Sequence, residues 1–396
     1  MIPLRLTPRV AVAATFAAFG LNAGAWAGAS AAVVARVGVS ATGFGLALTV
    51  MTVVYLAAMS SAGAIAARIG IRRTLLSSLL AMGPMLALLV SARNGLWLGI
   101  ALALFGALVG LLDSAMNAEG SRVEQRSGKP IFVQFHAVAS ATTAAFALFG
   151  SYLAFRGLGW LIALVVEVGL LVVAVIVAKA IDEPQGEPRI GGIGAAPRVI
   201  DAGLAMLGLA IGVSIVCESS ALAWSALLLR HDAPTLAAYA GAGAGLFAAF
   251  QAAMRFGIDR IRRAVSDRAL MLVSYAVAAL GLGLVAADLG FAASVLGFAI
   301  LGVGTGAIVP CGFALAARRP GLSAGAAISA VSFFGLFPRA PAPLLTGFVA
   351  DALSLSAAFF GLAVLMLIAM AGVAFLVPSP QRTSSRETLA PGGLAK

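Results

Sequence analysis

Asp113 and His136 are ionisable residues that lie within or beside long apolar runs. Gly106, Gly110, Asp113 and Asn117 recur at intervals of three or four residues, which places them on one face of a helix. A desolvated carboxylate and a nearby imidazole suit proton exchange near neutral pH. The pattern predicts either a proton-coupling carboxylate at Asp113 or an acid that links helix ends through hydrogen bonds to Asn117 or the next helix. For His136, near the start of its run and close to the membrane interface, the structural role is favoured.

Glu218 and Arg339 are opposite charges inside two apolar runs of the second half of the chain. A charged side chain within a membrane is costly, so it faces protein or a water-filled cavity and is a functional candidate. In one interpretation the two residues form an ion pair. In the other, Arg339 binds an anionic solute, because a guanidinium group forks onto a carboxylate or phosphate. The ion pair is favoured, and Pro338, Pro341 and Pro343 predict a kinked helix around Arg339.

Asn22 and Trp26 lie one helical turn apart in the first apolar run. Their amide and indole suit a sugar-like ligand, and packing between helices is an equal alternative. The glycine-rich stretches at 241–245 and 302–306 lack a preceding strand and a following Lys-Ser or Lys-Thr pair. We therefore expect them to pack helices closely instead of binding a nucleotide, and we expect no cofactor and no metal.

The composition places these residues in a membrane protein. The chain of 396 residues is 61% hydrophobic and only 10% charged, with a mean hydropathy of +1.05, whereas soluble domains are about 25% charged. Because about 20 apolar residues span a bilayer, we expect an all-α membrane protein of about 12 transmembrane helices. The expected spans are 10–34, 41–66, 74–91, 96–118, 131–155, 158–179, 199–229, 235–257, 269–287, 290–317, 323–350 and 354–377.

A segment rich in proline and glycine separates the spans into two sets of six. We expect an N-terminal six-helix bundle at 1–180, a cytoplasmic linker at 181–198, a C-terminal six-helix bundle at 199–378 and a cytoplasmic tail at 379–396. Most of the 26 lysine and arginine residues lie in turns on the side shared by both termini, which the positive-inside rule assigns to the cytoplasm. The net charge of +11 is thus spread over many loops, and we expect no nucleic-acid partner.

The two halves carry similar segments in the same order. "NAGAW" at 22–26 corresponds to "ESSALAW" at 218–224, and each is followed by a turn, another span and a basic turn. A parallel repeat of this kind favours a solute site between the halves, near the middle of the bilayer.

The basic turn at 63–73 resembles the G-x-x-x-D-R-x-G-R-R signature of the major facilitator superfamily, although Ala67 replaces its acid. The resemblance implies a gate at this turn, with Glu124 as a candidate partner for the arginines; alternatively, the arginines only follow the positive-inside rule. The candidate gating residues in the two halves are Gly63, Arg68, Arg72, Arg73, Glu124, Arg255, Asp259 and Arg260.

Three further segments, "DSAMNAEG", "CESSALAWSALLLRH" and "GVGTGAIVP", resemble a bacterial subgroup allied to the fucose-permease-like sugar transporters. The resemblance implies the major facilitator fold, with two six-helix bundles, alternating access and frequent coupling to protons. It also places the spans of Glu218 and Arg339 side by side. We therefore expect a multi-pass protein of the bacterial inner (plasma) membrane, embedded in the lipid bilayer as a monomer with both termini cytoplasmic.

The function expected from these features is secondary active transport of a small polar solute, sugar-like or an organic anion, together with protons, and no enzymatic activity. An efflux carrier for drugs or metabolites with the same fold is the alternative. A membrane sensor that does not transport is the rival from another class, and the short polar tail without an output domain weighs against it.

Overall fold

The computed structural model describes residues 6–182 and 201–377, and in these ranges every regular element is a helix. The linker predicted at 181–198 lies outside the described residues from position 183, as does the tail predicted at 379–396. The elements are α1 (Pro8–Val37), α2 (Ala41–Ile69), α3 (Ile71–Val90), α4 (Gly95–Ser127), α5 (Phe132–Phe155), α6 (Gly159–Ala180), α7 (Ala202–Asp232), the 3-10 helix η1 (Pro234–Tyr239), α8 (Ala242–Arg262), α9 (Asp267–Ala286), α10 (Phe291–Thr305), α11 (Ile308–Ala317), α12 (Ala324–Phe334), α13 (Leu336–Arg339), α14 (Ala342–Ala352) and α15 (Leu355–Leu376).

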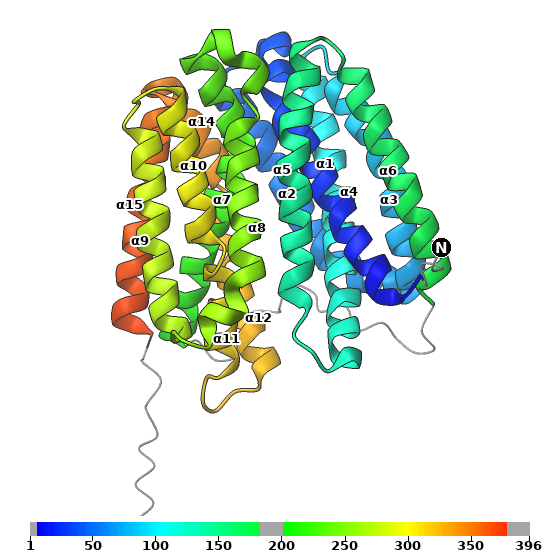
Figure 1. Cartoon of the computed structure of the whole chain (residues 1–396), viewed down its shortest axis with the longest axis vertical. Coiled ribbons are helices and arrows are strands. Elements are labelled where there is room, and N and C mark those ends of the chain that lie inside the picture. The colour runs from blue at the N-terminus through cyan, green and yellow to red at the C-terminus, as the bar shows by residue number, and fades with distance from the viewer. Residues whose placement is uncertain (1–5, 183–200, 378–396) are drawn as a thin grey trace, which may run out of the picture.

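Eleven helical segments in the described ranges are long and apolar enough to cross a bilayer. One of them joins α10 and α11, and another, Ala324–Ala352, joins α12, α13 and α14. α8 runs beside these segments (Figure 1) but is less apolar, because Gln251, Arg255 and Asp259 lie within it. The chain is therefore a multi-pass, all-α membrane protein, and α8 completes the predicted set of about twelve spans.

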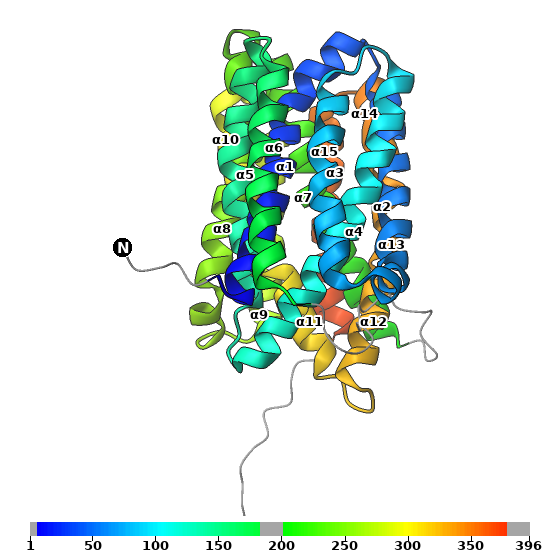
Figure 2. The same ribbon diagram turned by 90° about the vertical axis from the view of Figure 1, so that its right-hand side faces the viewer.

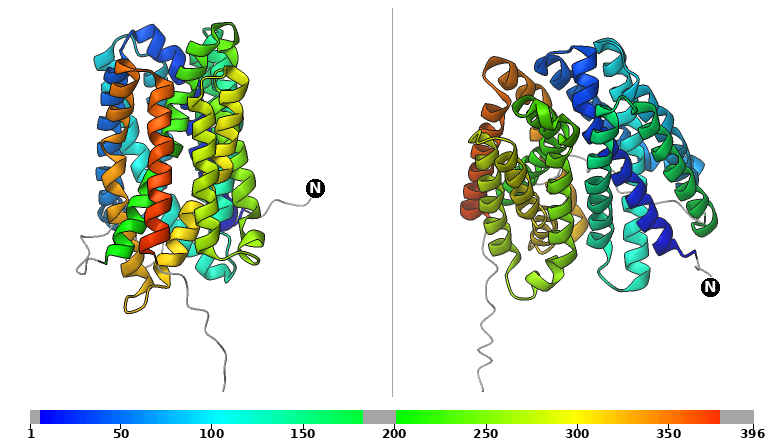
Figure 3. Two further views of the ribbon diagram at one scale, coloured as in Figure 1. Left: turned by 90° about the vertical axis from the view of Figure 1, so that its left-hand side faces the viewer. Right: turned by 45° about the horizontal axis from the view of Figure 1, so that its top comes forward.

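The helices form two groups that stand side by side, α1–α6 and α7–α15 (Figures 1 and 2). α1 begins and α15 ends at the same face of the molecule (Figure 3), which we call the terminal face. α2 and α8 begin at the other end of the bundle, the opposite face. Buried side chains from both groups form one large apolar cluster that includes Phe16, Leu79, Tyr275 and Phe298.

Glycines allow the helices of each group to pack with their backbones in contact. A Cβ atom on Gly24 of α1 would lie 2.4 Å from the carbonyl oxygen of Thr143 on α5, and one on Gly208 of α7 would lie 2.5 Å from that of Val331 on α12. These pairs occupy equivalent positions in the two groups. The packing has no room for a methyl group, as expected where small residues bring membrane helices together.

A second repeated seam joins α4 to α2 and α10 to α8. A Cβ atom on Gly106 would lie 2.5 Å from the carbonyl oxygen of Met51, and one on Gly302 would lie 2.1 Å from that of Phe247. The prediction that the stretch at 302–306 packs helices closely is confirmed at Gly302.

A third repeated contact ties the outer helices together at the terminal face. Arg72 at the start of α3 donates to the carbonyl oxygen of Ala178 near the end of α6, with an N–O distance of 2.5 Å. Arg268 at the start of α9 donates in the same way to Ala374 and Val377 at the end of α15, at 2.6 and 2.9 Å. Both arginines neutralise carbonyl groups that a helix end leaves without an intrahelical partner.

Candidate functional site

Asp113 is the centre of a hydrogen-bonded chain inside the first group of helices. One oxygen of its carboxylate accepts from the hydroxyl of Tyr55 at 2.5 Å. The other accepts from the amide of Asn117 at 2.7 Å, and the oxygen of this amide lies 3.1 Å from Nε2 of His136. The side chains predicted from helical spacing on α4 are thus brought together with the histidine of α5.

Local helix geometry explains this arrangement. Asp113 and Asn117 are one turn apart on α4. Gly106 and Gly110 lie on the same side of this helix, nearer to the opposite face of the molecule. At Gly110 the backbone of α2 approaches so closely that a Cβ atom would lie 2.4 Å from the carbonyl oxygen of Tyr55. The close approach of α2 to α4 at Gly110 therefore brings the phenol of Tyr55 within hydrogen-bond distance of the carboxylate of Asp113.

Tyr55 is the member of this hydrogen-bonded chain that sequence reasoning missed. Its signal was present, because a tyrosine in the middle of an apolar helix needs a partner for its hydroxyl group. Tyr55 lies near the midpoint of α2, between Ala41 and Ile69.

A second polar chain links the two groups of helices. Arg255 of α8 pairs with Glu218 of α7, with Nη2 and Oε2 3.3 Å apart. The same guanidinium donates to the hydroxyl of Ser140 on α5 at 2.9 Å. Ser140 in turn donates to the side-chain oxygen of Gln251 at 3.0 Å, and Gln251 donates to Thr305 at 3.2 Å.

The favoured ion pair between Glu218 and Arg339 is therefore wrong, because Arg255 takes the place of Arg339. Arg255 was expected in a basic turn, at the end of a span at 235–257. The 3-10 helix η1 occupies the first part of this range, so α8 begins only at Ala242 and ends at Arg262. This shift moves Arg255 into the helix and into the site.

Arg339 instead lies over Tyr55, with its guanidinium carbon 5.5 Å from the centre of the ring. It is close enough to both Asp113 and Glu218 for its charge to act on their carboxylates. No carboxylate of the described ranges lies within ion-pair distance of it.

The break in the helix around Arg339 is as predicted. Residues 324–352 form three helices, and the four-residue α13 ends at Arg339. Pro338, Pro341 and Pro343 lack the N–H group that would continue the helical ladder. The guanidinium is thus presented from an interrupted helix near the middle of the span.

Asn22 and Trp26 are buried in α1. Trp26 is 6% exposed and belongs to the apolar cluster, which favours packing over ligand contact. Asn22 is fully buried, and neither polar atom of its side chain has a hydrogen-bond partner.

The two groups of helices meet closely toward the opposite face. The carboxylate of Asp351 on α14 accepts from the backbone N–H groups of Ala41 and Thr42 at the start of α2, at 3.0 and 2.7 Å. Nearby, Phe44 packs edge-on against Trp224 with ring centres 5.2 Å apart. A Cβ atom on Gly45 would lie 2.5 Å from the carbonyl oxygen of Pro343.

Toward the terminal face the ribbons of the two groups stand apart (Figure 1). Among the hydrogen bonds between 6–182 and 201–377, the one nearest to this face joins Arg255 and Ser140. The closed contacts thus extend from the opposite face to the middle of the molecule, where the two polar chains lie.

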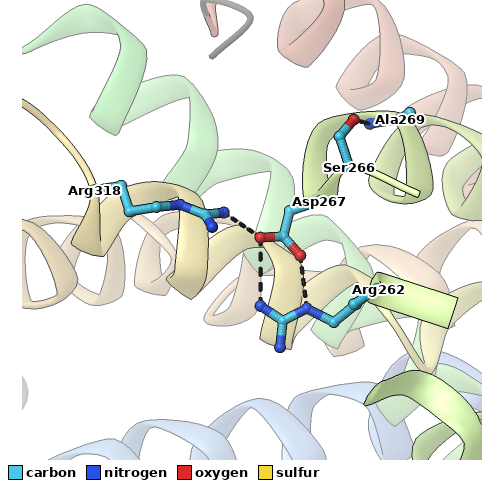
Figure 4. Close-up of polar contacts among 5 residues, drawn as sticks. All are labelled: Arg262, Ser266, Asp267, Ala269 and Arg318. Atoms are coloured by element: carbon cyan, nitrogen blue, oxygen red, sulfur yellow. Dashed lines mark hydrogen bonds and ion pairs between the residues drawn. The ribbon is translucent and has the colours of Figure 1, made fainter. Parts of the chain in front are cut away.

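At the terminal face of the second half, Asp267 pairs with two arginines, and no ion pair is seen for Asp259, a candidate gating residue, among the described residues. The carboxylate of Asp267 accepts from Nε of Arg262 at 2.6 Å and also from Arg318 (Figure 4). Asp259 and Arg260 lie in the last two turns of α8, beside this cluster.

Glu124 also differs from the expectation that it pairs with the basic turn. Its carboxylate accepts from the backbone N–H groups of Ile131 and Phe132, at 2.8 and 2.6 Å, and so caps α5. In the turn itself, Gly63 and Arg68 lie in the last two turns of α2, while Arg72 and Arg73 open α3. Of these, Arg72 ties α3 to α6 as described above.

Comparisons with known proteins agree in the class of protein. No protein-family model matches the chain. It is 29% identical over 363 residues to an uncharacterised MFS-type transporter of Yersinia pestis, a match that covers 91% of this chain and 94% of that protein. It is also 29% identical over 361 residues to an uncharacterised transporter of Sinorhizobium fredii, covering 90% and 94%.

Solved structures of transporters have the same fold. A variant of the nucleoside transporter NupG superposes with a TM-score of 0.74 at 9% identity, covering 94% of this chain and all (100%) of that one. A bacterial homologue of the human lysosomal transporter Spinster, solved in an inward-facing and occupied conformation, gives a TM-score of 0.72 at 14% identity, covering 92% and 95%. The human organic anion transporter TETRAN gives 0.61 at 16% identity, covering 92% and 99%.

Proposed function

We propose that this chain, an MFS-type transporter in its fold and its relatives, is a secondary active transporter that couples the movement of a small polar solute to protons. The observation that carries the proposal is the hydrogen-bonded carboxylate of Asp113, placed in the membrane beside the meeting surface of the two groups of helices. A carboxylate in that position can hold a proton in one state of the carrier and release it in another.

The neighbours of Asp113 stabilise its ionised state. In the ionised state each oxygen accepts one hydrogen bond, from Tyr55 and from Asn117. The chain continues through Asn117 to His136, in the first turns of α5 and nearer to the terminal face. Protons would enter and leave Asp113 from the face toward which the groups of helices diverge, while Asn117 and His136 hold the carboxylate in its orientation.

The closed contacts at the opposite face support alternating access. If the termini are cytoplasmic, as the distribution of basic residues predicts, the structure represents an inward-facing state. Asp351, Gly45 and Phe44 then form the outer gate. Transport requires this gate to open while the terminal face closes around the polar chains.

The test compares coupled and uncoupled transport in liposomes that contain the purified protein. A solute would first be identified by screening sugars, sugar acids, amino acids and drugs for thermal stabilisation of the protein, because a ligand that binds the folded state raises its melting temperature. Asp113→Asn should then abolish accumulation driven by a pH gradient but retain exchange of labelled for unlabelled solute. Loss of both activities in a folded protein, or loss of neither, would contradict the coupling role.

Asn117→Asp is unsuitable as a control because it adds a second acid to the chain. Asp288→Asn is the matched control, since Asp288 lies in the exposed turn between α9 and α10, outside the polar chains, and asparagine tolerates its φ of 53°. Its accumulation should equal that of the wild type. The direction of transport follows from the gradient orientation that drives accumulation, which also separates import from an efflux carrier.

A further inference from the structure

We infer that the solute is a small organic monoanion with a carboxylate group, and that it binds together with one proton so that the loaded site is electrically neutral. The inference rests on the proposed function and adds a substrate class and a charge stoichiometry to it.

The first step is the charge balance of the site. Among the described residues, four charged side chains meet at its centre: the carboxylates of Asp113 and Glu218 and the guanidinium groups of Arg255 and Arg339. Glu218 and Arg255 neutralise each other at 3.3 Å. Nε2 of His136 donates to the amide oxygen of Asn117, and in the neutral form His136 leaves the balance unchanged.

The second step concerns Arg339, the remaining cation. It contacts the face of the Tyr55 ring, and the carboxylate that its charge compensates is Asp113, to which Tyr55 is hydrogen-bonded. When Asp113 is ionised, the four charges sum to zero. When Asp113 takes up a proton, Arg339 is left without a balancing charge.

The third step is the cost of this imbalance. Arg339 is half-buried, and an unbalanced charge that is partly removed from water is unfavourable. A monoanion would remove that cost, whereas a neutral sugar would leave it in place and a dianion would reverse it. Protonation of Asp113 and binding of an anion to Arg339 therefore favour each other.

The fourth step is the chemistry of the anion. A guanidinium group offers two parallel N–H donors that match the two oxygens of a carboxylate. Arg339 ends α13 between two prolines, so it is held by a short helix and not by a regular helical face. A carboxylate is therefore the expected group, because phosphate monoesters carry up to two negative charges near neutral pH.

The experiment uses pairs of compounds that differ mainly in the carboxylate: D-glucuronate and D-glucose, lactate and propane-1,2-diol, and benzoate and benzyl alcohol. The melting temperature of the purified protein would be measured with each compound at about pH 5.5 and about pH 7.5, so that Asp113 is protonated in a larger fraction of molecules at the lower pH. At least one acid should stabilise the protein more than its uncharged partner does, and bind about tenfold more tightly at the lower pH.

Two variants sharpen the result. Arg339→Gln should remove stabilisation by the acid. Arg339→Lys retains the positive charge but lacks the two parallel N–H donors, so it should keep part of the stabilisation. Asp113→Asn imitates the protonated acid, so the anion should bind equally at both pH values. Loss of melting cooperativity in Arg339→Gln alone would leave the Asp113→Asn result to decide.

The charge stoichiometry is tested with the stabilising acid in liposomes. Uptake driven by a pH gradient should not change when valinomycin and potassium impose a membrane potential. Uptake that follows the potential, stabilisation by none of the acids, or equal binding of an acid and its uncharged partner would overturn the inference. Proton-driven uptake of a neutral sugar would refute the anion but retain the proposed function. Anion uptake without proton coupling would refute the proposed function and the shared proton, and would retain only the anion as substrate class.

Discussion

The guanidinium of Arg339 lies 5.5 Å above the ring of Tyr55, whose hydroxyl is hydrogen-bonded to Asp113. Tyr55 belongs to the first group of helices and Arg339 to the second, so this relationship spans the surface along which a carrier must open. One aromatic side chain thus contacts the group that would bind the anion and the group that would bind the proton.

Replacement of Tyr55 should separate these two contacts. Tyr55→Phe keeps the ring and removes only the hydroxyl, so the pH dependence of uptake should change while the KM for the solute stays near the wild-type value. Tyr55→Leu also removes the cation–π contact, which is worth about 0.5–2 kcal/mol, and should raise KM by about 2- to 30-fold. Uptake measured across a pH series checks both. Identical behaviour of the two variants would contradict the separate roles.

Gly45 should control the gate at the opposite face. A methyl group there would lie 2.5 Å from the carbonyl oxygen of Pro343 in the other group of helices, and overpacking of this kind costs about 1–3 kcal/mol. Gly45→Ala should therefore favour the state that is open at the opposite face. The measurement is maleimide labelling of Leu48→Cys, a buried position near the gate, against a low background because both native cysteines are buried.

Two glycines serve as controls for the gate. Gly106→Ala would clash with Met51 of the same group, so it should lower the melting temperature without increasing the labelling. A Cβ atom on Gly257 would have nothing within 4 Å, and Gly257→Ala should change neither. An increase in labelling that is equal in all three variants would show that labelling reports instability instead of gating.

Asp351 should stabilise the same closed gate from outside. Its carboxylate binds the first N–H groups of α2, an interaction with a helix N-terminus that is worth about 0.5–2 kcal/mol. Asp351→Ala should increase labelling of Leu48→Cys, and Asp351→Asn, which keeps an acceptor oxygen without the charge, should have a smaller effect. A labelling rate in Asp351→Ala equal to that of the wild type would remove Asp351 from the gate.

Asp201 should make stability depend on pH at the terminal face. Burial alone would raise the pKa of its carboxyl group, but hydrogen bonds from the Leu204 amide and from Arg319, together with the charge of Arg319, outweigh burial and hold the pKa below the usual value. Because the folded-state pKa is lowered, the stabilisation is fully present above the unfolded value of about 3.9 and is lost as pH falls through the folded one.

The corresponding measurement is the melting temperature of Asp201→Asn against wild type over a pH series. Asparagine keeps the cap of α7 but loses the charge pair with Arg319, for which N–O distances are 2.7–3.0 Å. The variant should be less stable by about 0.2–1 kcal/mol near neutral pH, since the pair is partly exposed. The difference should begin to shrink as pH falls below about 4 and should vanish only below the lowered folded-state pKa of Asp201. A difference that persists in acid would assign the effect to something other than ionisation.

Sequence reasoning captured what depends on one helix at a time. The approximate number of spans, the shared face of Asp113 and Asn117, and the break around Arg339 all follow from local periodicity and from proline chemistry. It also placed His136 near Asp113, because the two helices are joined by a short turn.

Contacts between distant helices were harder to predict, because they depend on rotation and offset. A shift of α8 by less than two turns changed Arg255 from a turn residue into the partner of Glu218. Tyr55 reaches Asp113 only because Gly110 admits α2. Asp267 pairs with Arg262 and Arg318 because it opens α9 beside them. None of these contacts between helices produces a periodic pattern in the amino-acid sequence.

The glycine seams also determine where this protein can vary. Wherever a backbone carbonyl of one helix touches a glycine of the next, as at Gly24, Gly106, Gly208 and Gly302, a single added methyl group is excluded. Substitutions are therefore tolerated mainly on two other surfaces, the one that faces lipid and the one that faces the solute. A chain built in this way can acquire a new cargo while the framework that carries it stays the same.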